Sequence, residues 1–225
     1  MNTSTGKIIS KINKNPFVIG IAGGTGSGKS FYAEELSKDL EGHGYETVLI
    51  SQDDFAIGRH FKDKNTSKYK FDDPKNYRIE ELAKAIKYLK AGKPIVFSAY
   101  DLKNHEPTKL KTLKFCTEKP KAILVEGIYA WLGILEAYID YKIFIDVSPE
   151  TRFILRTNRN VAQLKVNDLE TVTKMFWTNA YYAHKDFVEP MSKSADLIMQ
   201  PEINLQKILT GQKATLDRIQ LSRYK

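Results

Sequence analysis

Glycines, a lysine and a serine near the start of the chain stand at a spacing that suits the binding of a polyphosphate. Residues 23–30, G-G-T-G-S-G-K-S, fit the pattern G-x-x-x-x-G-K-[ST] in full. The glycines of this pattern let backbone N–H groups turn toward phosphates, and the helix that follows adds the positive end of its dipole. Lys29 is expected to reach the β- and γ-phosphates, and the Ser30 hydroxyl to bind Mg²⁺. The predicted nucleotide-binding residues are Gly23, Gly24, Thr25, Gly26, Ser27, Gly28, Lys29 and Ser30.

Carboxylates that follow two apolar runs could act on the bound phosphates. Asp53 and Asp54 come just after the run 47–50, and Glu126 comes just after the run 122–125. Adjacent residues of an extended chain point in opposite directions, so only one of the two aspartates can face the γ-phosphate. That carboxylate could accept the proton of an attacking hydroxyl, and Glu126 could be a second Mg²⁺ anchor. A solvated turn for the aspartates and a lysine-paired strand end for Glu126 are the alternatives.

The elements that must position these residues follow from the apolar pattern. Strands are expected at 17–22, 47–50, 95–100, 108–115, 122–125, 143–147 and 195–199, and helices at 32–40, 79–89, most of 150–187 and 205–221. Three of the strand runs are continuously apolar, which is typical of parallel strands covered on both faces. The polar stretch 56–76 is expected to be a long loop. The order predicts an α/β fold of the P-loop NTPase type, with a mostly parallel central sheet flanked by helices and a β-hairpin insertion.

Composition narrows the class of protein. A length of 225 residues favours one large domain. The only cysteine, Cys116, cannot form an internal disulfide, which favours a reducing, cytoplasmic location. We find no apolar signal-peptide core and no membrane-spanning run, so a membrane partner is not expected. The net charge of +8 favours an anionic partner, but the signatures of known RNA-binding modules are missing, so nucleic acid is not expected.

An ordered series of motifs between about residues 17 and 200 resembles the uridine/cytidine kinase family, which belongs with phosphoribulokinase and bacterial pantothenate kinase among the P-loop kinases. The segment S-Q-D-D-F at 51–55 is similar to the family's S-Q-D-S-F, whose aspartate is the catalytic base. The resemblance therefore implies that role for Asp53. V-E-G-I at 125–128 matches the family's strand end that contains Glu126, and A-D-L-I at 195–198 matches a downstream landmark.

Two further motifs resemble the segments with which the family binds its acceptor. F-D-D-P at 71–74 is similar to F-D-H-P, whose first aspartate holds the ribose hydroxyls, which implies that role for Asp72. Y-D-L-K-N-H at 100–105 resembles Y-D-F-x-x-H, in which the tyrosine and the histidine contact the nucleoside. The resemblance thus implies that Tyr100 and His105 bind the acceptor.

The lid motif departs from the family pattern R-x-x-R-D-x-x-x-R-G-R. Arg156 and Arg159 keep its first two arginines, Asn160 replaces the aspartate, and L-K-V at 164–166 stands where R-G-R is expected. Met175 occupies the place of a glutamine that helps to bind the nucleoside. Because an arginine at the transferred phosphoryl group can contribute about 10³ to 10⁵ in rate, an acceptor other than uridine, or slow turnover, stays open.

The resemblance implies a single P-loop kinase domain over 1–225, with an acceptor-binding insertion at about 52–116 and a helical lid at about 153–170. ATP and Mg²⁺ are the implied cofactors, a nucleoside is the implied small-molecule acceptor, and homo-oligomers occur among relatives. The implied roles are catalysis by Asp53 and Lys29, Mg²⁺ binding by Ser30 and Glu126, phosphate binding by Arg156 and Arg159, and acceptor binding by Asp72, Tyr100, His105 and Arg156. The alternatives are a sibling kinase for pantothenate or a sugar phosphate, and a nucleotide-binding regulatory protein that has lost catalysis.

Overall fold

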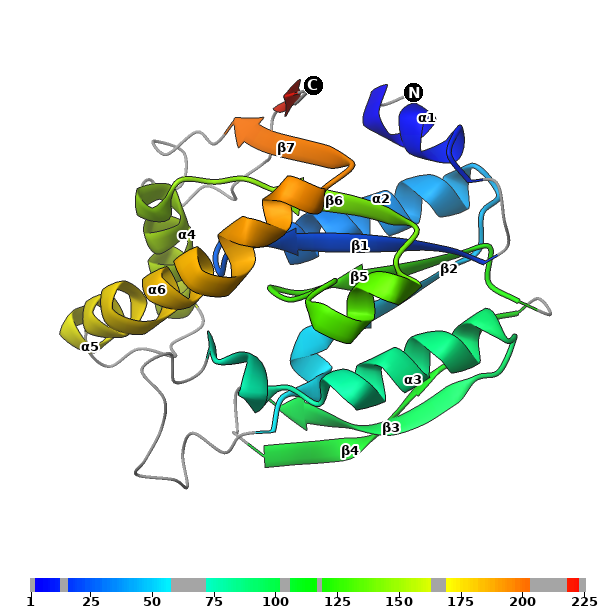
Figure 1. The fold of residues 1–225 in the computed structure, drawn as a ribbon, viewed down its shortest axis with the longest axis horizontal. Coiled ribbons are helices and arrows are strands. Elements are labelled where there is room, and N and C mark those ends of the chain that lie inside the picture. Colours follow the sequence, from blue (N-terminus) through cyan, green and yellow to red (C-terminus); the bar gives the residue numbers. More distant parts are fainter. Residues whose placement is uncertain are drawn as a thin grey trace.

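A six-stranded sheet forms the centre of the protein (Figure 1). The computed structural model describes residues 3–12, 16–57, 72–101, 106–116, 119–162, 169–202 and 218–222. The sheet has the order β2-β5-β1-β6-β7-β8, with β1 at Phe17–Gly23, β2 at Thr47–Ser51, β5 at Ala122–Glu126, β6 at Tyr141–Ile145, β7 at Leu197–Glu202 and β8 at Arg218–Ser222. All neighbouring pairs are parallel except β7 and β8, which are antiparallel. The predicted α/β fold with a mostly parallel sheet is confirmed.

Helices cover both faces of the sheet, which explains why its central strands are apolar throughout. Every residue of β1 and of β5 is buried. Ile19 and Ile21 of β1 pack in one core cluster with residues of α1 (Thr3–Ile9) and α2 (Lys29–Gly42). Val18 and Ala22 pack on the other face in a cluster with α3 (Ile79–Lys90). Alternate residues of one strand therefore supply two separate cores.

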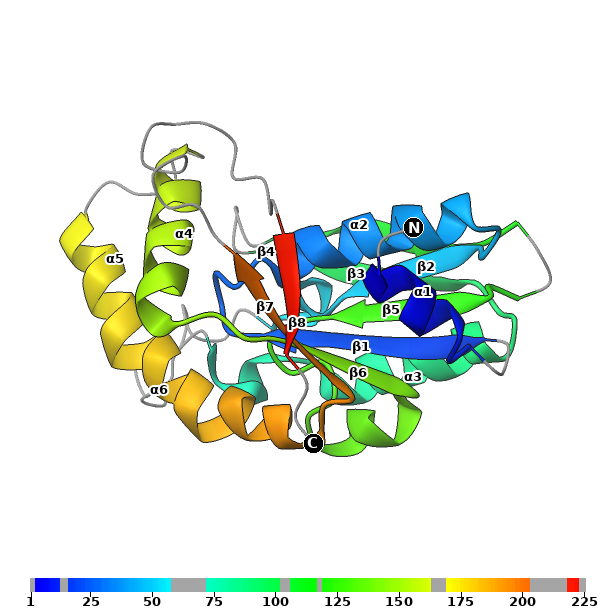
Figure 2. The same cartoon turned by 90° about the horizontal axis from the view of Figure 1, so that it is seen from above.

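The remaining elements lie at the edges of this sheet. A separate antiparallel hairpin is formed by β3 (Ile95–Asp101) and β4 (Glu106–Leu113), and α3 lies beside it (Figure 1). A helical arm contains α4 (Pro149–Ala162), α5 (Leu169–Met175) and α6 (Tyr181–Ala183), with π-helical turns at Phe176–Ala180 and His184–Val188 (Figure 2). Ser148 precedes α4, and its Oγ accepts a hydrogen bond from the N–H of Thr151 at 3.3 Å, as expected of an N-cap.

The prediction of a C-terminal helix at 205–221 is wrong for the part of this range that the structure describes. Residues 218–222 form β8, which pairs with β7, while 203–217 lie outside the described residues. The sequence R-I-Q-L-S alternates polar and apolar residues, which is the period of a strand, and the helical spacing over 205–221 hid this alternation. Helix α1 was not expected from the sequence either, although its Ile8 is fully buried. None of the described helices is both long and apolar enough to cross a membrane.

Candidate active site

The phosphate loop joins β1 to α2 at the carboxyl edge of the sheet. Gly26 and Gly28 have φ angles of 81° and 84°, a left-handed conformation that glycine adopts without steric cost. A Cβ on Gly23 would lie 2.7 Å from both the Ile145 carbonyl oxygen and Ser27 Oγ. The glycines at these three positions therefore allow a turn that other residues would strain or block.

The loop delivers Lys29 and Ser30 to the first turn of α2. Lys29 is one of the buried residues of α2, with 9% of the residue exposed. Its charge acts on two carboxyl groups, lowering the pKa of Asp72 and of Glu126 against the larger opposite effect of burial. An ammonium group enclosed among carboxylates at the end of a phosphate loop is suited to bind an anion.

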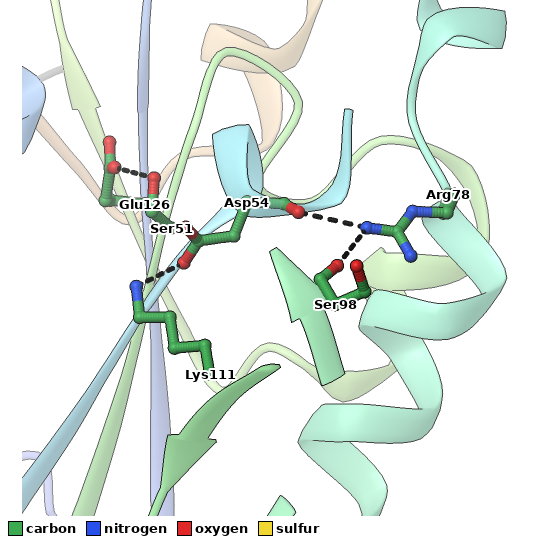
Figure 3. Close-up of polar contacts among 6 residues, drawn as sticks. All are labelled: Ser51, Asp54, Arg78, Ser98, Lys111 and Glu126. Carbon is green, nitrogen blue, oxygen red and sulfur yellow. Dashed lines mark hydrogen bonds and ion pairs between the residues drawn. The ribbon is translucent and has the colours of Figure 1, made fainter. Parts of the chain in front are cut away.

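Glu126 links three segments of the site. It ends β5, where it lies in register with Ile21 of β1 and Ser51 of β2. Ser51 Oγ donates a hydrogen bond to its Oε1 at 2.5 Å, as Figure 3 shows, and Ser30 Oγ donates to its Oε2 at 3.0 Å. Burial raises the pKa of Glu126, while Lys29 and both serine hydroxyls lower it. Serine and carboxylate oxygens together are the hard ligands that Mg²⁺ prefers, so this group of residues fits the expected ion.

The two aspartates after β2 have different surroundings. Both lie in the 3-10 turn Gln52–Phe55. Asp54 Oδ2 accepts a hydrogen bond from Lys111 Nζ of β4 at 2.5 Å, and its backbone oxygen accepts one from Arg78 Nη2 at 3.0 Å (Figure 3). The charge of Asp53 instead raises the pKa of Asp72 and of Glu126. Asp54 is thus held by the hairpin, and Asp53 belongs electrostatically to the phosphate site.

Asp72 belongs to the same electrostatic group, since Asp53 and Lys29 both act on its carboxyl. Its Oδ2 lies 4.0 Å from Arg156 Nη1, and its backbone oxygen accepts a hydrogen bond from the Tyr129 hydroxyl. Burial raises the pKa of Asp72, and Arg156 is the strongest influence that lowers it. Burial also raises the pKa of Tyr77, with Asp53 and Asp72 adding to the effect. The structure therefore brings Asp53, Asp72 and Tyr77 together. Tyr77 was not singled out because it lies between the stretch 56–76, which the sequence predicts as loop, and the helix predicted at 79–89.

The other predicted site residues are spread more widely. Arg156 Nη1 also donates to Thr25 Oγ1 at 3.3 Å, which connects the helical arm to the phosphate loop. Arg159 lies about one turn further along α4 and is exposed as a residue. Partial burial of its guanidinium and the Arg156 charge lower the pKa of Arg159, while Asp53 and Glu126 raise it. Tyr100 is buried in β3 next to a register shift between Ser98 and Tyr100. His105 lies outside the described residues.

Arg152 is a residue of this site that the sequence analysis missed. It lies on α4 four positions before Arg156, so the two share a helical face. A Cβ on Gly24 would collide with Arg152 Nη1, and one on Gly26 would collide with the Arg152 carbonyl oxygen. Helix α4 therefore packs directly on the phosphate loop. The four-residue spacing to Arg156 was the signal that could have found it.

Comparisons with known proteins identify the relatives of this chain. The model of the phosphoribulokinase / uridine kinase family matches residues 18–206. A uridine kinase of Macrococcus caseolyticus is 34% identical over 184 residues, which is 81% of this chain and 86% of that protein. The structure of a possible uridine kinase from Bacillus stearothermophilus has a TM-score of 0.62 at 20% identity, covering 87% of this chain and 94% of that one. D-glycerate 3-kinase from Cryptococcus neoformans has a TM-score of 0.65 at 15% identity, covering 97% and 98%.

The similarity to the two solved structures shows a shared fold, whereas the family match and the 34% identity show family membership. The family match spans most of the described sheet and the whole phosphate loop. Kinases with a P-loop transfer phosphoryl groups from nucleoside triphosphates. The chain belongs to the phosphoribulokinase / uridine kinase family of P-loop kinases.

Proposed function

We propose that this protein transfers the γ-phosphoryl group of ATP to the 5′-hydroxyl of a pyrimidine nucleoside. The observation that carries the proposal is the gathering of Asp53, Asp72 and Glu126 with Lys29 beside the phosphate loop. An ATPase needs only water next to the γ-phosphate, whereas this site has acidic groups beyond those that a metal ion requires. The 34% identity to a uridine kinase supports a nucleoside as the acceptor.

Each residue of the group has a chemical task in this reaction. The amides of residues 23–30 and the Lys29 ammonium bind the triphosphate. Ser30 and Glu126 would hold Mg²⁺, which when bound neutralises charge on the β- and γ-phosphates. Asp53 accepts the proton of the 5′-hydroxyl as this oxygen attacks phosphorus.

The acceptor is positioned on the side of the site opposite the loop. Asp72 accepts hydrogen bonds from the ribose hydroxyls, and Tyr100 and His105 contact the nucleoside. Arg156 bridges the two substrates, because its guanidinium reaches both Thr25 of the loop and Asp72. With Arg159 it closes the arm over the phosphates and excludes water, which otherwise competes for the phosphoryl group.

An ADP-release assay with ATP and Mg²⁺ tests the acceptor directly. The panel contains uridine, cytidine, purine nucleosides, pantothenate, ribulose 5-phosphate and D-glycerate, with a reaction lacking acceptor as the background. We expect uridine or cytidine to give the highest kcat/KM, and 5′-deoxyuridine to give none because it lacks the attacking hydroxyl. Turnover with pantothenate or a sugar phosphate alone would contradict the nucleoside proposal.

A sibling kinase acting on another hydroxyl compound is the second candidate. The observation in its favour is the ion pair between Asp54 and Lys111, which places a charged pair where the family has a serine. Met175, in place of the family's glutamine, removes a further polar group from the expected nucleoside site. The same panel separates the two candidates. Background rates with every acceptor would instead favour a regulatory protein that has lost catalysis.

A further inference from the structure

Buried polar atoms without partners gather around the phosphate loop. Ser27 Oγ, Arg152 Nη1 and Nη2, and His184 Nδ1 are enclosed and have no hydrogen-bond partner within the described part of the chain. A Cβ on Gly23 would lie 2.7 Å from Ser27 Oγ, and a Cβ on Gly24 would lie 2.8 Å from His184 Nδ1 and collide with Arg152 Nη1. Most buried polar groups in proteins are hydrogen-bonded, so a group of unpaired ones at one place requires a physical reason.

Arg152 is the charged member of this group. Its residue is fully buried, its Nε donates to the Val147 carbonyl oxygen at 3.1 Å, and its guanidinium lies 5.7 Å from the centre of the Phe176 ring. Among the described residues no carboxylate forms an ion pair with it, although Asp72 and three other acidic residues act on it from a longer distance. Burial lowers the pKa of Arg152 to about 10, so the side chain remains a cation at neutral pH.

An enclosed cation with two unpaired nitrogens destabilises a fold unless an anion approaches it. His184 cannot supply this anion, because an imidazole is either neutral or a cation. Burial and the neighbouring Arg152 charge lower its pKa to about 3, so it stays neutral beside Arg152. Gly24, against which the guanidinium lies, is part of the loop that binds a polyphosphate. The phosphates of a nucleotide bound in this loop would therefore bring negative charge to the guanidinium.

We propose that Arg152 is a further phosphate-recognition residue of this kinase, and that the polyphosphate of the bound nucleotide balances its buried charge. The proposal deepens the proposed function and rests on it for ATP as the ligand. It separates the roles of two arginines on one helical face. Arg156 connects Thr25 with Asp72, whereas Arg152 meets the loop at Gly24 and contributes charge to nucleotide binding.

Arg152→Met tests the proposal because it keeps an apolar stem of similar length and removes the charge. We expect the nucleotide-free variant to melt at the same temperature as the wild type or higher, since a buried unpaired charge is lost. Calorimetric titration with Mg²⁺ and ATP, and with Mg²⁺ and inorganic tripolyphosphate, should show affinities at least about tenfold lower. Arg152→Lys keeps the charge without the planar fork, so its affinities should lie between those of the wild type and of Arg152→Met.

Arg78→Met is the matched control. Arg78 Nη2 is paired with the backbone oxygens of Asp54 and Ser98, and no Arg78 atom is among the nearest neighbours of the loop glycines, so its loss should lower the melting temperature and leave the tripolyphosphate affinity within about twofold. A merely structural Arg152 would give this same pattern, and a poorly folded Arg152→Met would lose both melting temperature and affinity; either result would overturn the proposal. None of these titrations contains an acceptor, so a failure of nucleoside phosphorylation would leave their outcome unchanged.

Discussion

Lys111 donates a hydrogen bond to Asp54 at 2.5 Å and thereby joins the β3–β4 hairpin to the turn that contains the proposed base, Asp53. Arg78 adds a second connection between the same two segments, because its Nη2 donates both to the Asp54 backbone oxygen and, at 2.7 Å, to the Ser98 oxygen of β3 (Figure 3). Phe55 of the turn also stacks on Phe97 of the hairpin, with ring centres 4.7 Å apart. The position of Asp53, the proposed base, therefore depends on this hairpin.

Lys111→Met should weaken acceptor binding more than chemistry. The pair is partly exposed, with 43% of the Lys111 side chain and 16% of the Asp54 side chain accessible, so its loss should cost only about 0.5–1 kcal/mol, or about a two- to fivefold rise in acceptor KM. We expect kcat to change less than KM, and the KM for ATP to stay constant. Steady-state kinetics with each substrate varied in turn provide the measurement.

A double-mutant cycle separates this pair from other effects. If the ion pair accounts for the change, Asp54→Asn in the Lys111→Met background should add little to the single substitution. Lys114→Met, which replaces an exposed lysine just beyond the same strand, is the control and should leave all three constants unchanged. Additive effects of Asp54→Asn and Lys111→Met would show that the two side chains act independently.

Asp53→Asn should abolish phosphoryl transfer while leaving nucleotide binding nearly intact. Asparagine keeps the shape of the side chain but cannot accept the proton of the attacking hydroxyl, and loss of a general base lowers rates by about 10² to 10⁴. Single-turnover transfer measures the chemical step, and calorimetry with ATP and Mg²⁺ measures binding. Unchanged turnover would exclude Asp53 as the base and turn attention to Asp72, which belongs to the same electrostatic group.

Local patterns in the sequence predicted the phosphate loop, because its chemistry resides in eight consecutive residues. The buried strands were also predictable, since continuous apolar runs identify parallel strands covered on both faces. The partners of the two aspartates were not, because Lys111 lies 57 residues from Asp54 and only the fold brings them together. Arg152 escaped notice for a similar reason. Its four-residue spacing to Arg156 indicates a shared helical face, but does not show that its guanidinium lies against Gly24.

Gly127→Ala should reduce both stability and activity. A Cβ at this position would collide with Gln52 Oε1, which accepts a hydrogen bond at 2.9 Å from the backbone N–H of Tyr129. Moving Gln52 breaks that buried bond, and the overpacking adds strain, for a combined loss of about 1–3 kcal/mol in the free energy of unfolding. Urea denaturation measures the loss. Gly42→Ala, with open space around its Cβ, is the control and should leave the free energy of unfolding unchanged or slightly higher.

Glu126→Gln should change the pH dependence of stability in the nucleotide-free protein. Burial raises the folded-state pKa of Glu126 above the unfolded value of about 4.3, so between the two values the folded state binds more protons than the unfolded state. The wild type therefore loses stability as pH rises through this window, and the glutamine variant lacks that loss. The variant also loses one of the two carboxylate oxygens that accept bonds from Ser30 and Ser51, an effect that does not depend on pH. Urea denaturation at pH 4.5 and pH 7.5 measures the free energy of unfolding of both proteins. Relative to the wild type, the variant should be more stable at pH 7.5 than at pH 4.5, and an equal difference at both pH values would contradict a raised Glu126 pKa.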